Sequence, residues 1–169
     1  SNGYITGIDI DEISLSLLQR KIKETALSNQ VRFIKDSILT MDFPEESFDI
    51  IWAEGSIFVM GFEKSIKKWR RFLKPLGFLV IHDENKDKIE KLQVIPKCGY
   101  KRISQFEISA KSWWIDYFNP LEQLIQKFRH KYSNDSELIT ELDKDQCEID
   151  KCKSNSNMVC SFFVIMQKV

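Results

Sequence analysis

The chain has few of the features that mark whole classes of protein. Its 169 residues carry 25 acidic and 25 basic side chains, so the formal net charge is zero. That balance gives no general attraction to nucleic acid or to an anionic membrane. No apolar run approaches the roughly 18 residues of a membrane-spanning helix, and no signal peptide is recognisable. We therefore expect a cytoplasmic protein with no nucleic-acid or membrane partner.

Cysteine and histidine are too few and too scattered to predict a metal centre. The six residues are Cys98, Cys147, Cys152, Cys160, His82 and His130. Only Cys147 and Cys152 lie close together, and their five-residue offset does not match a paired-cysteine zinc site. Reduced thiols in a cytoplasmic protein are the simpler interpretation.

Glycine is scarce as well. The six glycines stand at positions 3, 7, 55, 61, 77 and 99, and no Gly-x-Gly-x-Gly run occurs. In nucleotide-binding folds, a strand, such a glycine-rich turn and a helix begin about 20 residues before the acid that binds the ribose. Here an acid of that kind, Asp9, ends a strand pattern that only three residues precede. We expect the chain to start one strand–helix unit late in its fold.

Strand and helix patterns alternate through the first part of the chain. Strands are predicted at 4–9, 31–35, 48–53, 78–81 and 101–109, and helices at 12–27, 63–73 and 85–95. Such alternation predicts a mostly parallel sheet with helices on both faces. The second part differs, with helices predicted at 112–132 and 134–153 and a closing strand at 158–167.

Asp9 is the most informative single residue. An acid at the carboxyl end of a parallel strand, just before a crossover helix, is where a doubly wound fold binds a ribose diol. A carboxylate suits this task because it accepts hydrogen bonds from both hydroxyls. The alternative is that Asp9 is only the N-cap of the following helix.

Four landmarks occur in an informative order. They are Gly7-Ile8-Asp9, Phe33-Ile34-Lys35-Asp36-Ser37, Ser47-Phe48-Asp49-Ile50-Ile51 and Leu73-Lys74-Pro75-Leu76-Gly77. In this order and spacing the chain resembles the class I S-adenosylmethionine-dependent methyltransferases from their second strand onward. Its tail, with Trp113-Trp114, Tyr117 and Asn119-Pro120-Leu121-Glu122, is similar to a small-molecule methyltransferase subgroup.

The resemblance implies a particular α/β architecture. It is a Rossmann-like, doubly wound, mostly parallel sheet with an antiparallel C-terminal strand, lacking the usual first strand and glycine-rich loop. We expect one methyltransferase-like domain over residues 1–169, with a helical, lid-like insert at about 111–153.

The resemblance also assigns cofactor roles to individual residues. Asp9 would bind the ribose hydroxyls of S-adenosylmethionine, and Ile10 would pack on the adenine. Asp36 would accept from the adenine amino group, with backbone contacts from Ser37 and Ile38. The alternative for Asp36 is an ordinary Asx turn. Because the glycine-rich loop is missing, we expect the 169-residue chain to bind the cofactor weakly or not at all.

Other residues are candidates for the side of the site that holds the small-molecule methyl acceptor. Glu54 ends a strand and would contact the acceptor or the ammonium group of the cofactor; a solvated loop acid is the alternative. Trp113, Trp114 and Tyr117 lie in the insert, and aromatic faces attract cationic or flat molecules. Their alternative role is to pack a lid helix on the sheet.

Catalytic residues are not identified by the sequence. Glu54, His82, Asp83 and Tyr117 are the candidates for a general base. Two other functions stay open, a non-catalytic pseudo-methyltransferase that acts as an interaction module and an NAD-binding Rossmann enzyme. The Asp36 and Lys74-Pro75-Leu76-Gly77 landmarks fit the NAD-binding pattern less well.

Two structural expectations follow from the departures from the family pattern. Pro75-Leu76-Gly77 replaces Pro-Gly-Gly, which the turn accepts if only Gly77 needs a positive φ. The absent first unit would leave strands 4–9 and 48–53 with open edges. These strands would then pair with each other, or another chain would fill the gap and give a homo-oligomer.

Overall fold

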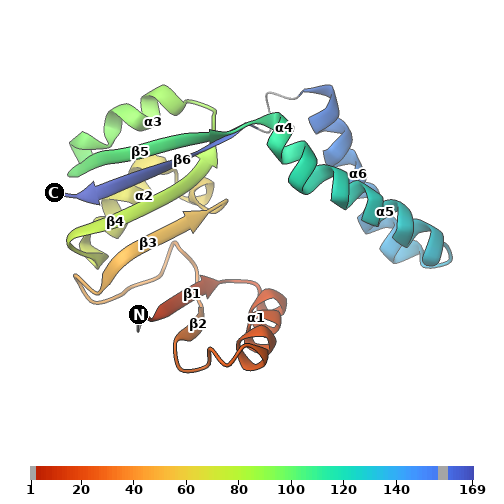
Figure 1. Ribbon diagram of the computed structural model, residues 1–169, viewed down its shortest axis with the longest axis horizontal. Helices are drawn as coiled ribbons and strands as arrows, with labels where there is room; N and C mark the ends of the chain where they lie inside the picture. The colour runs from red at the N-terminus through yellow and green to blue at the C-terminus, as the bar shows by residue number, and fades with distance from the viewer. Residues whose placement is uncertain (1–2, 156–159) are drawn as a thin grey trace. The chain divides into compact units, whose positions relative to one another are not determined.

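The computed structural model describes residues 3–155 and 160–169 (Figure 1). The chain forms two compact units, Ser1–Pro44 and Glu45–Val169. We call them the N-terminal and C-terminal units and describe each by itself. The expectation of a single domain over 1–169 stays a prediction.

The N-terminal unit is one parallel βαβ element. Strand β1 (Ile5–Asp9) leads into helix α1 (Glu12–Glu24), and strand β2 (Val31–Lys35) returns beside β1. The register pairs Ile5 with Val31 and Asp9 with Lys35, so both strands end at the same edge. The buried residues of this unit are Leu15, Ile22 and Met41.

The C-terminal unit is built on a four-stranded mixed sheet. Its strands are β3 (Phe48–Glu54), β4 (Leu73–Glu84), β5 (Tyr100–Ile108) and β6 (Ser161–Lys168), in the spatial order β3-β4-β6-β5. Strands β3 and β4 are parallel, whereas β6 runs antiparallel to both of its neighbours, β4 and β5. The expected antiparallel closing strand is therefore confirmed. The expectation of a mostly parallel sheet is wrong for this unit, because β6 lies between β4 and β5 and is antiparallel to both. The predicted start of that strand at Met158 lies outside the described residues.

Two helices belong to the sheet of the C-terminal unit. They are α2 (Phe62–Trp69) and α3 (Lys88–Val94), and short 3₁₀ turns lie at Ile57–Val59, Arg70–Phe72 and Pro96–Cys98. The helix predicted at 63–73 is formed by α2 and the 3₁₀ turn that follows it, and it buries one apolar face, because Ile66, Trp69 and Phe72 are at most 1% exposed. Alternate residues of the strands complete this core: Leu79, Ile81, Phe162, Val164 and Met166 are all fully buried.

Strand β4 starts earlier than the sequence predicts. It begins at Leu73, which pairs with Phe48, and an irregularity in the register precedes the regular pairing of Ile50 with Phe78. At this irregularity Leu76 adopts a φ of +62°, whereas Gly77 does not have a positive φ. A Cβ on Gly77 would lie 2.9 Å from the Lys74 carbonyl oxygen and 3.1 Å from that of Asp49. The assumption that Gly77 supplies the positive φ is wrong; Gly77 is needed because two backbones approach closely.

The predicted insert is helical except for the turn at 132–135. It contains α4 (Ala110–Trp113), a π-helical turn (Trp114–Phe118), α5 (Asn119–Lys131) and α6 (Ser136–Ser154). Figure 1 shows α5 and α6 side by side as a helical pair. Their shared core contains Phe118, Ile125, Leu142 and Ile149. Within the described residues, no helix is long and apolar enough to cross a membrane.

Each open-edged strand has a partner within its own unit. Among residues 3–155 and 160–169, β1 pairs with β2, and β3 pairs with β4. Strands β1 and β3 belong to different units. Pairing of β1 with β3 and filling of their other edges by a second chain both stay predictions.

Candidate functional site

Two carboxylates, those of Asp9 and Asp11, lie at the end of β1 and have different roles. Asp11 is the N-cap of α1: its Oδ1 accepts from the Ile13 backbone N–H at 3.2 Å, and its Oδ2 accepts from that of Ser14 at 2.9 Å. The Ser14 hydroxyl also donates to Asp11 Oδ2 at 2.6 Å. The alternative that Asp9 caps this helix is therefore wrong. Asp9 is left exposed at the strand end, where its Oδ1 accepts from the Asp11 backbone N–H at 2.9 Å.

The capping bonds have an electrostatic consequence for Asp11. The hydrogen bond from the Ser14 hydroxyl, followed by the bonds from the Ser14 and Ile13 backbone, stabilises the ionised carboxylate and lowers the pKa of Asp11. An ion pair of Lys35 with Glu12, 2.7 Å long, lies at the same edge. The hydrogen bond from Lys35 lowers the pKa of Glu12.

Asp36 lies beside Asp9 at this edge. Its backbone N–H donates to the Asp9 carbonyl oxygen at 3.1 Å, which continues the ladder one step beyond β2. The half-buried side chain of Asp36 accepts through Oδ1 from the Thr40 hydroxyl at 2.9 Å and from the Ser37 backbone N–H at 2.7 Å. These local bonds are compatible with an Asx turn and with a fixed carboxylate that faces a ligand.

The three other cofactor candidates complete the same edge. Ile10 is 69% exposed, so its side chain offers an apolar surface next to Asp9. Ser37 is half-buried, and its hydroxyl accepts from the Leu39 backbone N–H at 3.2 Å. Ile38 is half-buried as well. The structure thus brings Asp9, Ile10, Asp36, Ser37 and Ile38 together within one unit.

The candidates of the C-terminal unit meet on a different surface. Strand pairing sets four side chains in register across the whole sheet: Glu54 opposite His82, His82 opposite Phe163, and Phe163 opposite Phe106. The Phe163 ring stacks on His82 at 4.4 Å and on Phe106 at 4.9 Å between centroids. Trp52, two residues before Glu54, meets Phe163 edge-on at 5.9 Å.

Trp113 connects the helical segment to this surface. Its ring stacks on His82 at 5.9 Å, and its indole N–H donates to the Ser161 hydroxyl at 3.0 Å. The Ser161 hydroxyl and His82 Nε2 are 2.8 Å apart. Because an indole N–H can only donate, Ser161 accepts from Trp113. Its hydroxyl donates to His82 Nε2 or accepts from it, according to the tautomer of the ring.

Tyr117 and Trp114, the other two aromatic candidates, contact different parts of the C-terminal unit. Tyr117 is 51% exposed and meets Trp113 edge-on at 5.7 Å, so it extends the same aromatic surface. Trp114 packs against the core of the helical pair, and the Lys153 ammonium lies 5.2 Å from its ring centroid. These contacts favour a packing role for Trp114. Asp83, another candidate base, is ion-paired with Lys91 at 2.7 Å.

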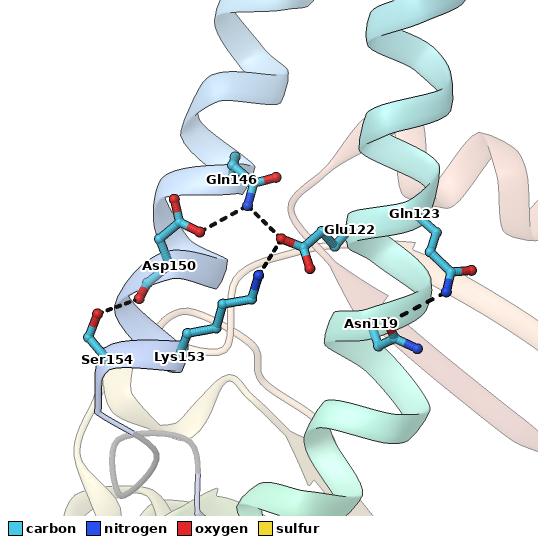
Figure 2. A network of polar contacts seen from close by, with 7 residues as sticks. All are labelled: Asn119, Glu122, Gln123, Gln146, Asp150, Lys153 and Ser154. Atoms are coloured by element: carbon cyan, nitrogen blue, oxygen red, sulfur yellow. Dashed lines mark hydrogen bonds and ion pairs between the residues drawn. The ribbon is translucent and has the colours of Figure 1, made fainter.

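Lys153 also belongs to a polar network that joins α5 to α6 (Figure 2). The Glu122 carboxylate accepts from Lys153 Nζ at 2.6 Å and from Gln146 Nε2 at 2.9 Å. The Glu122 side chain is only 15% exposed. The hydrogen bonds from Lys153 and then Gln146 lower the pKa of Glu122. This network holds the two helices together. The contacts of Glu122 with Lys153 and Gln146 therefore indicate a structural role for this acid.

Four residues that make the sheet surface continuous are not among the candidates predicted from the sequence. These are Trp52, Phe106, Ser161 and Phe163. The alternation of β6 shows that Ser161 and Phe163 share one face, because side chains two residues apart point the same way. Their neighbours depend on the strand order β3-β4-β6-β5, which no local pattern in the sequence specifies.

Comparison with known proteins gives a consistent result. The sequence model of a family described as a methyltransferase domain matches residues 1–81. A Haemophilus influenzae protein is 31% identical over 119 residues, which cover 60% of this chain and 47% of that protein. The phosphoethanolamine N-methyltransferase of Plasmodium falciparum is 25% identical over 150 residues, covering 74% of this chain and 53% of that enzyme.

Solved structures share the fold. A methyltransferase from Geobacter sulfurreducens, solved in complex with S-adenosyl-L-homocysteine, superposes with a TM-score of 0.73 at 16% identity. The superposition covers 97% of this chain and 75% of that one. The chain spans about half the length of the Haemophilus and Plasmodium proteins named above.

Proposed function

We propose that the chain, which resembles the class I S-adenosylmethionine-dependent methyltransferases and matches a methyltransferase-domain family over residues 1–81, takes part in methyl transfer from this cofactor to a small molecule. One observation carries the proposal: the backbone bond from Asp36 to Asp9 sets two acid-bearing strand ends side by side. Ligands of open α/β sheets bind outside the carboxyl ends of the parallel strands. The Plasmodium relative, which acts on phosphoethanolamine by name, supports a small acceptor.

The residues at this edge suit the adenosine half of the cofactor. Asp9 is exposed and ionisable, and a carboxylate accepts from two neighbouring hydroxyls at once. Asp36 is held by Thr40 and offers an acceptor for an amino group, while Ile10 supplies apolar surface for a flat base. Ser37 and Ile38 would contribute backbone contacts. None of the six glycines forms the closely spaced run that cradles the methionine half.

The chemistry asks little of the protein beyond alignment. When bound, the cofactor supplies a methyl group on a sulfonium, which is a good leaving group. The protein mainly orients the reactants, since correct placement removes much of the entropic barrier. A base is needed only for an acceptor that carries a proton on its reacting atom. Among the candidates, His82 is fixed by Ser161, whereas Asp83 is committed to Lys91.

Binding of S-adenosyl-L-homocysteine by the 169-residue chain tests the proposal. We expect weak binding, seen by calorimetry or NMR only at high ligand concentration. Asp9→Ala should weaken it by about 1.5–3 kcal/mol, the range for a lost charge-assisted hydrogen bond, or roughly 10- to 150-fold. Glu24→Gln is the matched control. It removes an exposed carboxylate from the last turn of α1 and should leave the affinity unchanged.

Two outcomes would count against parts of this proposal. Equal affinity in the Asp9→Ala variant would remove Asp9 from the site. Micromolar affinity of the parent chain would contradict the expected weakness and show that other residues replace the glycine-rich contacts. The alternative function is a non-catalytic interaction module with a methyltransferase-like fold.

A further inference from the structure

An aromatic surface of the C-terminal unit lies outside the residues proposed to hold adenosine. We call Trp52, His82, Phe106, Trp113 and Phe163 the aromatic row. Trp52 is 61% exposed and Phe106 is 51% exposed, although each contacts Phe163. Single exposed apolar residues are ordinary, but a continuous exposed ring surface marks a binding site.

Glu54 is an acid of this surface. Glu54 is the partner of His82 in the β3–β4 register, so it belongs to the same line of side chains as Phe163 and Phe106. Its Oε1 accepts from the Trp52 indole N–H at 2.5 Å, which fixes the carboxylate against the ring. Glu54 is exposed, so its charge is available to a ligand.

The basic side chains near this part of the sheet serve the other face. The ammonium groups of Lys88 and Lys91 lie 5.6 and 5.9 Å from the centroid of Phe162, which is fully buried. Phe162 and Phe163 point to opposite faces because successive side chains of a strand alternate. Lys88 and Lys91 are also ion-paired, with Glu107 and Asp83. The face of the aromatic row therefore carries a negative charge and electron-rich rings.

We propose that the aromatic row and Glu54 bind the methyl acceptor through a positively charged ammonium group. Ring faces attract cations through their quadrupole, most strongly for tryptophan, and a neighbouring carboxylate adds to that attraction. The acceptor class is then a small alkylammonium compound rather than an acid or a neutral aromatic. That the bound ammonium compound is the methyl acceptor rests on the proposed function, whereas the existence of the cation site does not.

A pair of probes with the same shape tests the site. Choline and 3,3-dimethyl-1-butanol differ in charge but present nearly the same methyl groups. Each is titrated into the full chain while NMR follows the indole N–H signals, with that of Trp52 identified from the Trp52→Phe variant. We expect choline to shift the Trp52 signal saturably and the alcohol to bind about tenfold more weakly or not at all. The signal of Trp69, which is 1% exposed, serves as an internal reference.

Variants decide whether Glu54 matters. Glu54→Gln should weaken choline binding about three- to tenfold, whereas Glu90→Gln, which removes an exposed carboxylate from α3, should not. Equal binding of the alcohol, or unchanged choline affinity in Glu54→Gln, would overturn the inference. So would a Trp52 signal that changes with protein concentration but not with choline, because a second copy would then cover the face. The titration needs no cofactor, so its failure is distinct from failure of Asp9 in the cofactor test.

Discussion

At the scale of single residues, Asp9 and Asp11 differ in how well the sequence predicts their roles. Asp9 ends β1, and Asp11 is the N-cap of α1. The pattern predicts an acid at the end of β1, and the structure has Asp9 there. It does not show which acid caps α1, because Asp9 and Asp11 both precede the helix. The choice depends on the extended backbone of Asp11, with φ −82° and ψ 115°, which turns its carboxylate toward the first free N–H groups.

The assignment of Asp11 as the cap gives a pH-dependent prediction. Its pKa is lowered in the folded chain, so its contribution to the free energy of unfolding is complete above the unfolded pKa. That contribution is lost as the pH falls below the ordinary value near 3.8 and through the lower folded value. Asp11→Asn keeps a capping oxygen but cannot ionise, so its stability should vary less with pH in this window.

Thermal unfolding followed by circular dichroism between neutral and acid pH measures this difference. Asp11→Ala should lower the unfolding temperature at neutral pH, since it removes the cap altogether. Asp11→Asn should lie between Asp11→Ala and the parent at neutral pH and approach the parent in acid. Identical pH profiles for the parent and Asp11→Asn would show that ionisation of the capping carboxylate does not contribute to stability.

At the scale of elements, local patterns predicted helices well and strand neighbours poorly. The apolar face of α2 follows from a helical period and is buried as expected. The row from Glu54 to Phe106 needs four strands from distant parts of the chain, and its register is set by the whole sheet. The start of β4 at Leu73 was not predicted either, because Pro75 and Gly77 are typical of a turn rather than of a strand.

The irregularity at the start of β4 distinguishes two neighbouring residues. Gly77→Ala should destabilise the chain by about 1–3 kcal/mol, since its Cβ would meet two carbonyl oxygens. Leu76→Gly should stay within about 1 kcal/mol of the parent, because relief of the positive φ offsets the greater backbone entropy of glycine. The Leu76 side chain is 65% exposed, so little packing is lost. Urea unfolding of both variants gives the comparison; an equal loss in both would contradict it.

The helical pair offers a second element to test. Glu122→Gln should lower the unfolding temperature, because it leaves the Lys153 ammonium without its carboxylate. Glu141→Gln is the control, since Glu141 pairs with Lys144 while both side chains are more than 60% exposed, and such exposed pairs contribute little. The lowered pKa of Glu122 predicts that the difference between Glu122→Gln and the parent shrinks in acid, as the parent carboxylate is protonated.

At the scale of the whole molecule, the fold class was predictable because four landmarks keep the order and spacing of a known family. The division into an N-terminal βαβ unit and a C-terminal sheet unit was not, because it depends on how densely distant segments contact each other. The adenosine candidates all fall in the first unit and the aromatic candidates in the second. The landmarks specify the order of the strands but not which edges remain open.

Open strand edges lead to the prediction about assembly. Within the described part of the chain, β1 and β3 each have a strand partner on one side only. Apolar residues stand on both strands, with Ile5 62% exposed and Ile50 57% exposed. Unpaired backbone groups beside exposed apolar side chains favour association with another strand. We therefore expect the chain to form a homo-oligomer whose mass, measured by analytical ultracentrifugation, rises with concentration.

A charge on an edge strand opposes such pairing, which gives a matched pair of variants. Ile50→Lys should shift the sedimentation profile toward the monomer. Ile89→Lys carries the same change at a residue of α3 that is 70% exposed, and it should sediment like the parent. Equal effects of the two substitutions would indicate general repulsion rather than an edge contact. A parent chain that stays monomeric at every accessible concentration would refute association through the strands.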